Sequence, residues 1–268
     1  MMSFKMIFSR KLHFLQPTRL ILLVFVISLA LIGNTLAGPI EDCKEYAKYG
    51  VPSNDAVLLC RKAYLLSHSS EYKEPRWVVY HITKEHSKKM VKRLDNFKAD
   101  PDLRKGERAE LKDYRTSGYD RGHIMPAADA SWNQDAMQET FYLSNIAPQV
   151  GLGFNKGIWK ELEEKIRKWA KERGELYIYA GPIFAFKDVK TIGLNHVAVP
   201  THFFKIVFDP QKVEAIAFIC PNVSLKSGTI QYYIVSIKDI EQRTGFDFLS
   251  ALGKGVQQKI EANISEMW

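Results

Sequence analysis

The spacing of apolar and polar positions along the chain predicts a sheet. Residues 76–83 are rich in β-branched and aromatic side chains, which strands favour. Four further segments share this character: residues 141–146, 175–180, 203–208 and 213–219. Asp209-Pro210 is a turn signal between the last two of them. The pattern predicts a central antiparallel sheet.

Other segments have the periodicity of helices. Within residues 156–173, apolar side chains recur at three- and four-residue spacing and form one face: Ile158, Leu162, Ile166 and Trp169. Gly174 is expected to end this helix. A second helix is expected over residues 131–139, and one or two more after Val235. Strands with segregated helices on the flanks indicate an α+β fold.

The first 37 residues have the pattern of a secretory signal peptide. Four basic residues and no acidic ones precede an apolar run over residues 20–33, and Thr35-Leu36-Ala37 provides a cleavage site. We expect cleavage after Ala37 and a secreted or periplasmic protein without stable membrane association. The alternative is that the apolar run stays as an uncleaved membrane anchor.

The remaining 268 − 37 = 231 residues suit one domain, since no linker, repeat or low-complexity segment divides residues 38–268. The net charge of +8 includes four leader cations, which leaves 8 − 4 = +4 for this part. A mildly basic chain is compatible with a polyanionic partner, but the charge alone does not select one.

The three cysteines fit an oxidising compartment only in part, because their number is odd. A disulfide between Cys43 and Cys60 would tie down an end of the chain that otherwise frays. Cys220 ends an apolar run and is expected to be a buried free thiol. No cysteine or histidine spacing is typical of a structural zinc site.

The segment Tyr119-Asp120-Arg121-Gly122-His123 brings a carboxylate, a guanidinium and an imidazole together. Phosphodiester hydrolysis needs a base, and it needs a cation to offset charge on the phosphate. His123 is suited to be that base because a free imidazole has a pKa of about 6.5. Gly122 would let a substrate backbone approach closely. The alternative is a surface histidine or a hydrogen-bonded core histidine.

A row of residues at four-residue spacing borders the apolar face of the long helix: Asn155, Trp159, Glu163 and Arg167. The amide oxygen of Asn155 and the carboxylate of Glu163 are hard ligands that suit Mg²⁺. Asn155 is equally compatible with a helix N-cap. Glu163 and Arg167 are equally compatible with a surface ion pair.

These residues resemble the DNA/RNA non-specific endonucleases of the Serratia nuclease type, which carry a ββα-metal finger. Asp120-Arg-Gly-His123 resembles the DRGH signature of that family, and Tyr142-Leu-Ser-Asn-Ile-Ala-Pro-Gln149 resembles its second strand. Asn155, Trp159 and Glu163 resemble its metal-binding helix. Residues 77–83 and 96–100 also resemble family blocks, so the resemblance covers nearly all of residues 38–268.

The resemblance implies a role for each site residue. His123 is the expected general base, and Asn155 is the expected direct ligand of a single Mg²⁺, which Mn²⁺ can replace. Glu163 would hold water bound to that metal, and Arg93 would stabilise the transition state. The supporting or phosphate-binding residues are expected to be Arg121, Arg167, Asn145 and Asp120.

The expected substrates are DNA and RNA of any base sequence, cut to leave 5′-phosphate and 3′-hydroxyl ends. Two other functions compete with this one. The first is a nucleic-acid-binding protein that has lost catalysis, and the second is a metal-dependent phosphodiesterase acting on small nucleotides. The sequence does not specify the oligomeric state.

Overall fold

A computed structural model describes residues 38–86, 88–185 and 187–268. The expected signal peptide, residues 1–37, lies outside the described residues. In the part that is described, no helix is both long and apolar enough to cross a membrane. Residues 38–268 form one compact unit.

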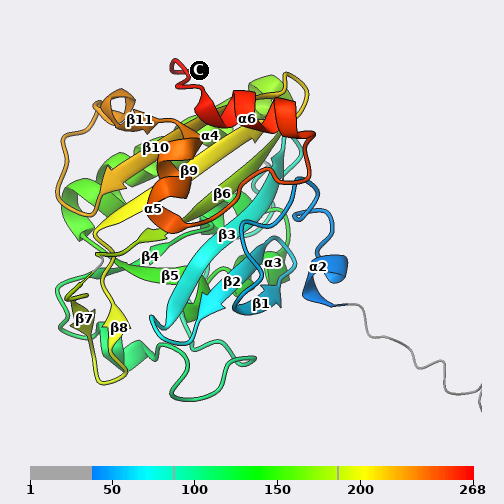
Figure 1. Cartoon of the computed structure of the whole chain (residues 1–268). Helices are drawn as coiled ribbons and strands as arrows, with labels where there is room; N and C mark the ends of the chain where they lie inside the picture. The colour runs from blue at the N-terminus through cyan, green and yellow to red at the C-terminus, as the bar shows by residue number, and fades with distance from the viewer. Residues whose placement is uncertain (1–37, 87, 186) are drawn as a thin grey trace, which may run out of the picture. The chain divides into compact units, whose positions relative to one another are not determined.

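A seven-stranded antiparallel sheet is the centre of the fold, in the order β1-β2-β3-β6-β9-β10-β11 (Figure 1). Its strands are β1 Val57–Cys60, β2 Leu65–Ser69, β3 Glu74–Thr83, β6 Glu175–Ile183, β9 His202–Asp209, β10 Glu214–Pro221 and β11 Ile234–Val235. Two smaller sheets pair β4 Asp120–His123 with β5 Ile146–Gln149, and β7 Thr191–Ile192 with β8 Val197–Ala198. The predicted α+β class with a central antiparallel sheet is confirmed.

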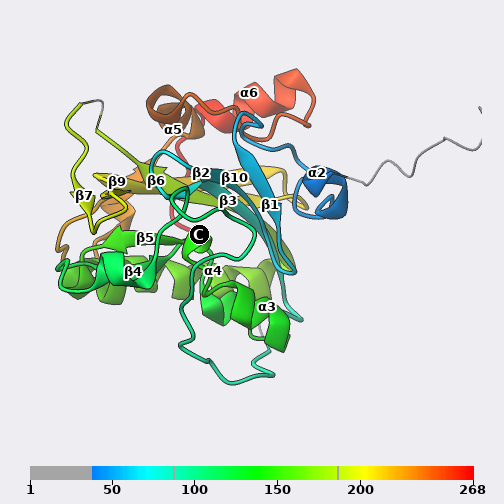
Figure 2. The same ribbon diagram turned by 90° about the horizontal axis from the view of Figure 1, so that it is seen from below.

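Helices cover both faces of the large sheet. They are α2 Pro39–Asp42, α3 Gln134–Glu139, α4 Trp159–Arg173, α5 Ile237–Thr244 and α6 Lys254–Ala262. Figure 2 shows α5 and α6 on one face, and α3, α4 and the β4–β5 pair on the other. Short 3₁₀ turns lie at Leu111–Tyr114, Ala127–Ala130, Leu143–Asn145 and Ile230–Tyr233.

The alternation of side chains along β9 explains why the sheet has a core on each face. Phe203 and Val207 pack in the cluster that contains Trp159 of α4. Phe204 and Ile206, which point the other way, pack in the cluster that contains Ile240 of α5. The central strands are therefore apolar on both faces, and their sequences are nearly continuous apolar runs.

Three predicted boundaries differ most from the structure. The helix expected over residues 131–139 begins only at Gln134, because the side chain of Asn133 caps it. Residues 141–146 are not a strand: the chain makes a 3₁₀ turn at Leu143–Asn145, and β5 begins only at Ile146. The long helix begins at Trp159 instead of residue 156, because Gly157 has φ −118° and ψ −114°, which are not helical angles. The sequence pattern detected apolar content correctly but not these local backbone turns.

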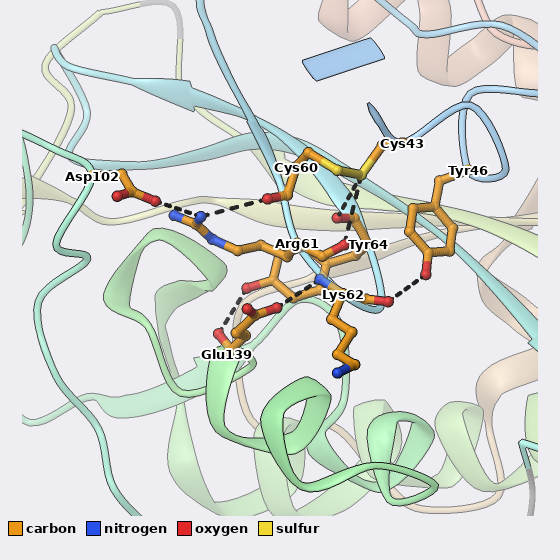
Figure 3. Close-up of a disulfide and its surroundings, with 8 residues drawn as sticks. All are labelled: Cys43, Tyr46, Cys60, Arg61, Lys62, Tyr64, Asp102 and Glu139. Atoms are coloured by element: carbon orange, nitrogen blue, oxygen red, sulfur yellow. Dashed lines mark hydrogen bonds and ion pairs between the residues drawn. A yellow bond between two sulfur atoms is a disulfide. The ribbon is translucent and has the colours of Figure 1, made fainter. Parts of the chain in front are cut away.

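The predicted disulfide between Cys43 and Cys60 is present (Figure 3). Cys220 is a buried free cysteine. Arg61 directly follows the bridge and donates to both carboxylate oxygens of Asp100 at 2.7 Å. Arg61 also donates to Asp102 at 2.6 Å, as Figure 3 shows. The bridge and this arginine therefore anchor the loop that leads toward the candidate site.

Candidate active site

The strands β4 and β5 and the helix α4 form a ββα unit. The two strands pair so that Asp120 faces Gln149 and His123 faces Ile146. The segment Gly151–Ile158 then connects β5 to α4. Because side chains alternate along a strand, Arg121 and His123 share one face of β4. The ββα arrangement implied by the resemblance is present.

His123 is buried among aromatic rings at the end of β4. Its ring centre lies 5.3 Å from that of Phe97 and 4.9 Å from that of Phe141. Its Nε2 has no hydrogen-bond partner among the described residues. The pKa of His123 is lowered to about 3, chiefly by burial and also by the charges of Arg93 and Arg121, against the opposing effect of Asp95. The imidazole is therefore neutral at pH 7. With the ordinary histidine pKa of about 6.5, part of it would be protonated at that pH.

Two arginines lie against the same aromatic rings. The Arg121 guanidinium lies 4.3 Å from the ring centre of Phe97, and the Arg93 guanidinium lies 5.1 Å from that of Phe141. Arg93 also forms an ion pair with Asp95, with Nε and Oδ1 2.8 Å apart. Both arginines act on the pKa of His123, so the structure brings the three residues together as the sequence predicted.

Asn155 is joined to β4 through Asp120. Its Nδ2 donates to Asp120 Oδ2 at 3.0 Å, and Lys156 Nζ lies 2.8 Å from the same oxygen. Burial would raise the pKa of Asp120, but the hydrogen bonds from Lys156 and Asn155 outweigh it and lower the pKa. Asn155 does not cap α4, whose N-cap is Ile158, so the capping alternative is excluded.

A cavity of about 360 Å³ opens beside these groups. Asp120, Arg121, Asn155, Lys156 and Phe97 are among the residues that line it. With Arg115, which also lines it, the cavity presents an amide, a carboxylate and three cations at one place. This mixture suits an anionic ligand together with a hard metal ion.

Glu163 lies on α4 and faces the large sheet. The pKa of Glu163 is raised to about 7, chiefly by burial and also by Asp129, while the positive charges of Lys205, Arg167 and Arg93 oppose the shift. The surface ion pair between Glu163 and Arg167, which the sequence left open as an alternative, does not form. Arg167 pairs instead with the buried Asp129, at 2.8 Å between Nη1 and Oδ1.

Asn145 and Gly122 lie next to other protein groups, in places that a substrate does not reach. Asn145 is fully buried and its amide is engaged with backbone groups of Met125 and Thr140. It can support the site only by holding the chain that follows β4. A Cβ at Gly122 would lie 2.1 Å from the side chain of Gln149. The expectation that Gly122 makes room for substrate is therefore wrong: Gln149 fills that space.

Sequence reasoning missed three charged residues that contact predicted site residues: Lys156, Asp129 and Lys205. One of them carried a signal, since Lys205 interrupts the otherwise apolar segment Phe203-Phe-Lys-Ile-Val-Phe208. Lys156 and Asp129 lie in segments of mixed composition, where a single charge is ordinary. Only their contacts identify them.

Three carboxylates gather elsewhere, at Glu241, Asp247 and Glu261. They lie on and between α5 and α6, on the other face of the sheet from α4 (Figure 2). Glu241 already accepts a hydrogen bond from the backbone of Phe248, and Asp247 accepts one from Gln257. This group is separate from the site around His123.

Known nucleases are similar to this chain in sequence and in structure. Nuclease C1 of Cunninghamella echinulata var. echinulata is 37% identical over 220 residues, which are 76% of this chain and 87% of the relative. Human Endonuclease G, mitochondrial, is 35% identical over 219 residues, covering 76% and 73%. The crystal structure of the EndoG/EndoGI complex matches with a TM-score of 0.75 and 31% identity, over 82% of this chain and 95% of that one.

These relatives correct one expectation from the sequence. Several of them, from fission yeast, human, cattle, budding yeast and Caenorhabditis elegans, are mitochondrial nucleases or mitochondrial Endonuclease G by name. The expectation of a secreted or periplasmic protein is therefore contradicted. A basic leader followed by an apolar run was not sufficient to assign the compartment, because several targeting segments share a basic, acid-poor composition.

The family is shown by a match over most of the chain. The model of the DNA/RNA non-specific endonucleases matches residues 43–254. That range includes β4, β5 and α4 and all the predicted site residues. The resemblance inferred from the DRGH segment is thereby confirmed, and this chain belongs to the DNA/RNA non-specific endonuclease family.

Proposed function

We propose that this chain hydrolyses phosphodiester bonds in DNA and RNA with a divalent metal, Mg²⁺ or Mn²⁺, and leaves 5′-phosphate and 3′-hydroxyl ends. One observation carries the proposal: a neutral imidazole, His123, lies beside two arginines at the end of β4. A neutral imidazole can accept a proton from water, and the arginines can offset the charge of a phosphate.

His123 acts as the general base in this proposal. Its Nε2 is buried and has no protein partner in the described residues, so a water molecule that enters with the substrate would be its hydrogen-bond partner. A bound phosphate adds negative charge near Arg93 and Arg121. Because those arginines lower the pKa of His123, a phosphate between them makes the imidazole a stronger base.

Asn155 would hold the metal. Its Nδ2 is engaged by Asp120, so its amide oxygen is the atom that it offers to the cavity. A neutral oxygen beside a carboxylate is a donor set that fits Mg²⁺ or Mn²⁺. The bound cation would supply Lewis-acid stabilisation of charge on the phosphate. Glu163 acts as a carboxylate that holds water near this ion.

The arginines position and stabilise the phosphate. Arg121 is exposed and lines the cavity, which makes it accessible to a nucleic-acid backbone. Arg93 is half exposed and lies against the ring of Phe141. Contacts of this kind recognise phosphate groups and not bases. They therefore support cleavage without base specificity.

Two substitutions test the separate roles of the base and the metal ligand. Removal of a general base costs roughly 10²–10⁴-fold in rate, so His123→Ala should bind nucleic acid and Mg²⁺ but turn over slowly at every Mg²⁺ concentration. Asn155→Ala should instead need more Mg²⁺ and recover part of its activity as the metal concentration rises. A His123→Ala protein with wild-type turnover would contradict the mechanism.

The same preparations separate the competing functions. Plasmid and single-stranded RNA are incubated with wild-type protein and Mg²⁺, with EDTA added to a parallel sample. A nuclease cuts both polymers until EDTA is added. A binding protein retards their migration without cutting, and a small-nucleotide phosphodiesterase leaves both polymers intact while it hydrolyses a nitrophenyl phosphodiester.

A further inference from the structure

Lys205 is a fully buried lysine in the middle of β9. Its neighbours across the sheet are Ala180 and Phe218, which carry no charge. Its Nζ lies 4.3 Å from the ring centre of Trp159 and has no hydrogen-bond partner within the described ranges. A buried ammonium is costly unless an opposite charge compensates for it. The burial of Lys205 therefore depends on a nearby group of opposite charge.

Glu163 is the carboxylate that pairs with this lysine. The Nζ of Lys205 lies 4.0 Å from Glu163 Oε1, and the Glu163 side chain is only 14% exposed. The neighbouring carboxylate, Asp129, is already held by Arg167 at 2.8 Å. These four charged side chains therefore form two ion pairs, Lys205 with Glu163 and Arg167 with Asp129. Their net charge is zero.

We propose that Lys205 is a positioning residue for the nuclease reaction: it lies beneath Glu163, and its ion pair holds the Glu163 carboxylate in place. This inference rests on the proposed role of Glu163 as a carboxylate that holds water near the metal. Lys205 itself is 0% exposed and does not reach the substrate. It acts only through Glu163.

The groups around Glu163 explain why Lys205 is important for this carboxylate. Facing Glu163 are Lys205 from β9, Asp129 from the turn Ala127–Ala130, Arg167 from α4, Arg93 from the loop after β3, and Tyr80 from β3. Burial and Asp129 favour the neutral acid, whereas Lys205 is the strongest influence in favour of the carboxylate. Without Lys205, the remaining cations are committed to Asp129 and Asp95.

The first test is Lys205→Met, which keeps the length of the side chain and removes its charge. Without the ion pair, the Glu163 carboxylate loses a contact that fixes its position, and a misplacement of about 1 Å can cost on the order of 10²-fold in rate. We therefore expect kcat to fall by at least about fivefold. The KM for DNA should stay near that of wild type, because no phosphate contact is removed.

Matched variants separate this role from a structural one. Val207→Ala changes a buried residue on the same face of β9 without touching a charge, so its kcat and pH profile should stay those of wild type. Lys205→Arg keeps the positive charge and should restore much of the kcat. Lys205→Gln is a second neutral variant, in case Lys205→Met does not fold, and circular dichroism checks each protein.

A double-mutant cycle with Glu163→Gln gives the decisive result. If Lys205 acts through Glu163, then Lys205→Met should reduce kcat little further in a Glu163→Gln protein. Multiplicative losses in the double variant, or wild-type kcat in both neutral Lys205 variants, would overturn the inference. A fully active Glu163→Gln protein would instead overturn the proposed role of Glu163, so the two failures are distinguishable.

Discussion

Folding stability should depend on pH through His123. In the folded protein its pKa is about 3, chiefly because of burial, whereas a histidine in an unfolded chain has a pKa of about 6.5. At pH 7.5 both states hold a neutral imidazole. As the pH falls below about 6.5, the unfolded chain takes up a proton that the folded protein does not. Acid therefore favours unfolding.

The size of the effect follows from the difference in pKa. Each pH unit between the two pKa values is worth about 1.4 kcal/mol. With a folded pKa of about 3, the contribution of His123 should lower the free energy of unfolding by about 1.4 kcal/mol at pH 5.5 and about 2.7 kcal/mol at pH 4.5. This is a large part of the stability of an ordinary domain.

Urea unfolding in EDTA, at pH values between about 4.5 and 7.5, measures this contribution against His123→Phe. Phenylalanine keeps a ring beside Phe97 and Phe141 but cannot take up a proton. The wild type should lose about 2.7 kcal/mol more than the variant over this range. His196→Asn removes an exposed histidine and should follow the wild type. Equal pH dependence in wild type and His123→Phe would refute the reasoning.

Three further predictions concern packing, the disulfide and the substrate. Gly122→Ala should destabilise the protein by roughly 1–3 kcal/mol in urea, and adding Gln149→Ala should restore part of that, since a Cβ would meet Gln149. Cys43→Ser opens a bridge between residues 17 apart and should cost about 3 kcal/mol; an unchanged midpoint would contradict this. DNA cleavage should slow steeply as salt rises from about 50 to 200 mM, whereas a flat profile would argue against phosphate contacts.

Local pattern was sufficient for most of the sheet and for the family. The strands β3, β6, β9 and β10 were predicted because both of their faces are buried and their apolar content is continuous. The paired cysteines and the free Cys220 were also predicted correctly. The short strands β1 and β2 were missed, since segments of four and five residues carry little pattern.

The sequence by itself determined which chemical groups are present, because the segment from Asp120 to His123 and the residues Asn155 and Glu163 identify the family. Only the tertiary structure decided the state of those groups. Contacts between β4, the aromatic rings and the arginines set the pKa of His123, and β9 provides the partner of Glu163. Ionisation depends on burial and on charges from distant parts of the chain, so no local pattern can report it.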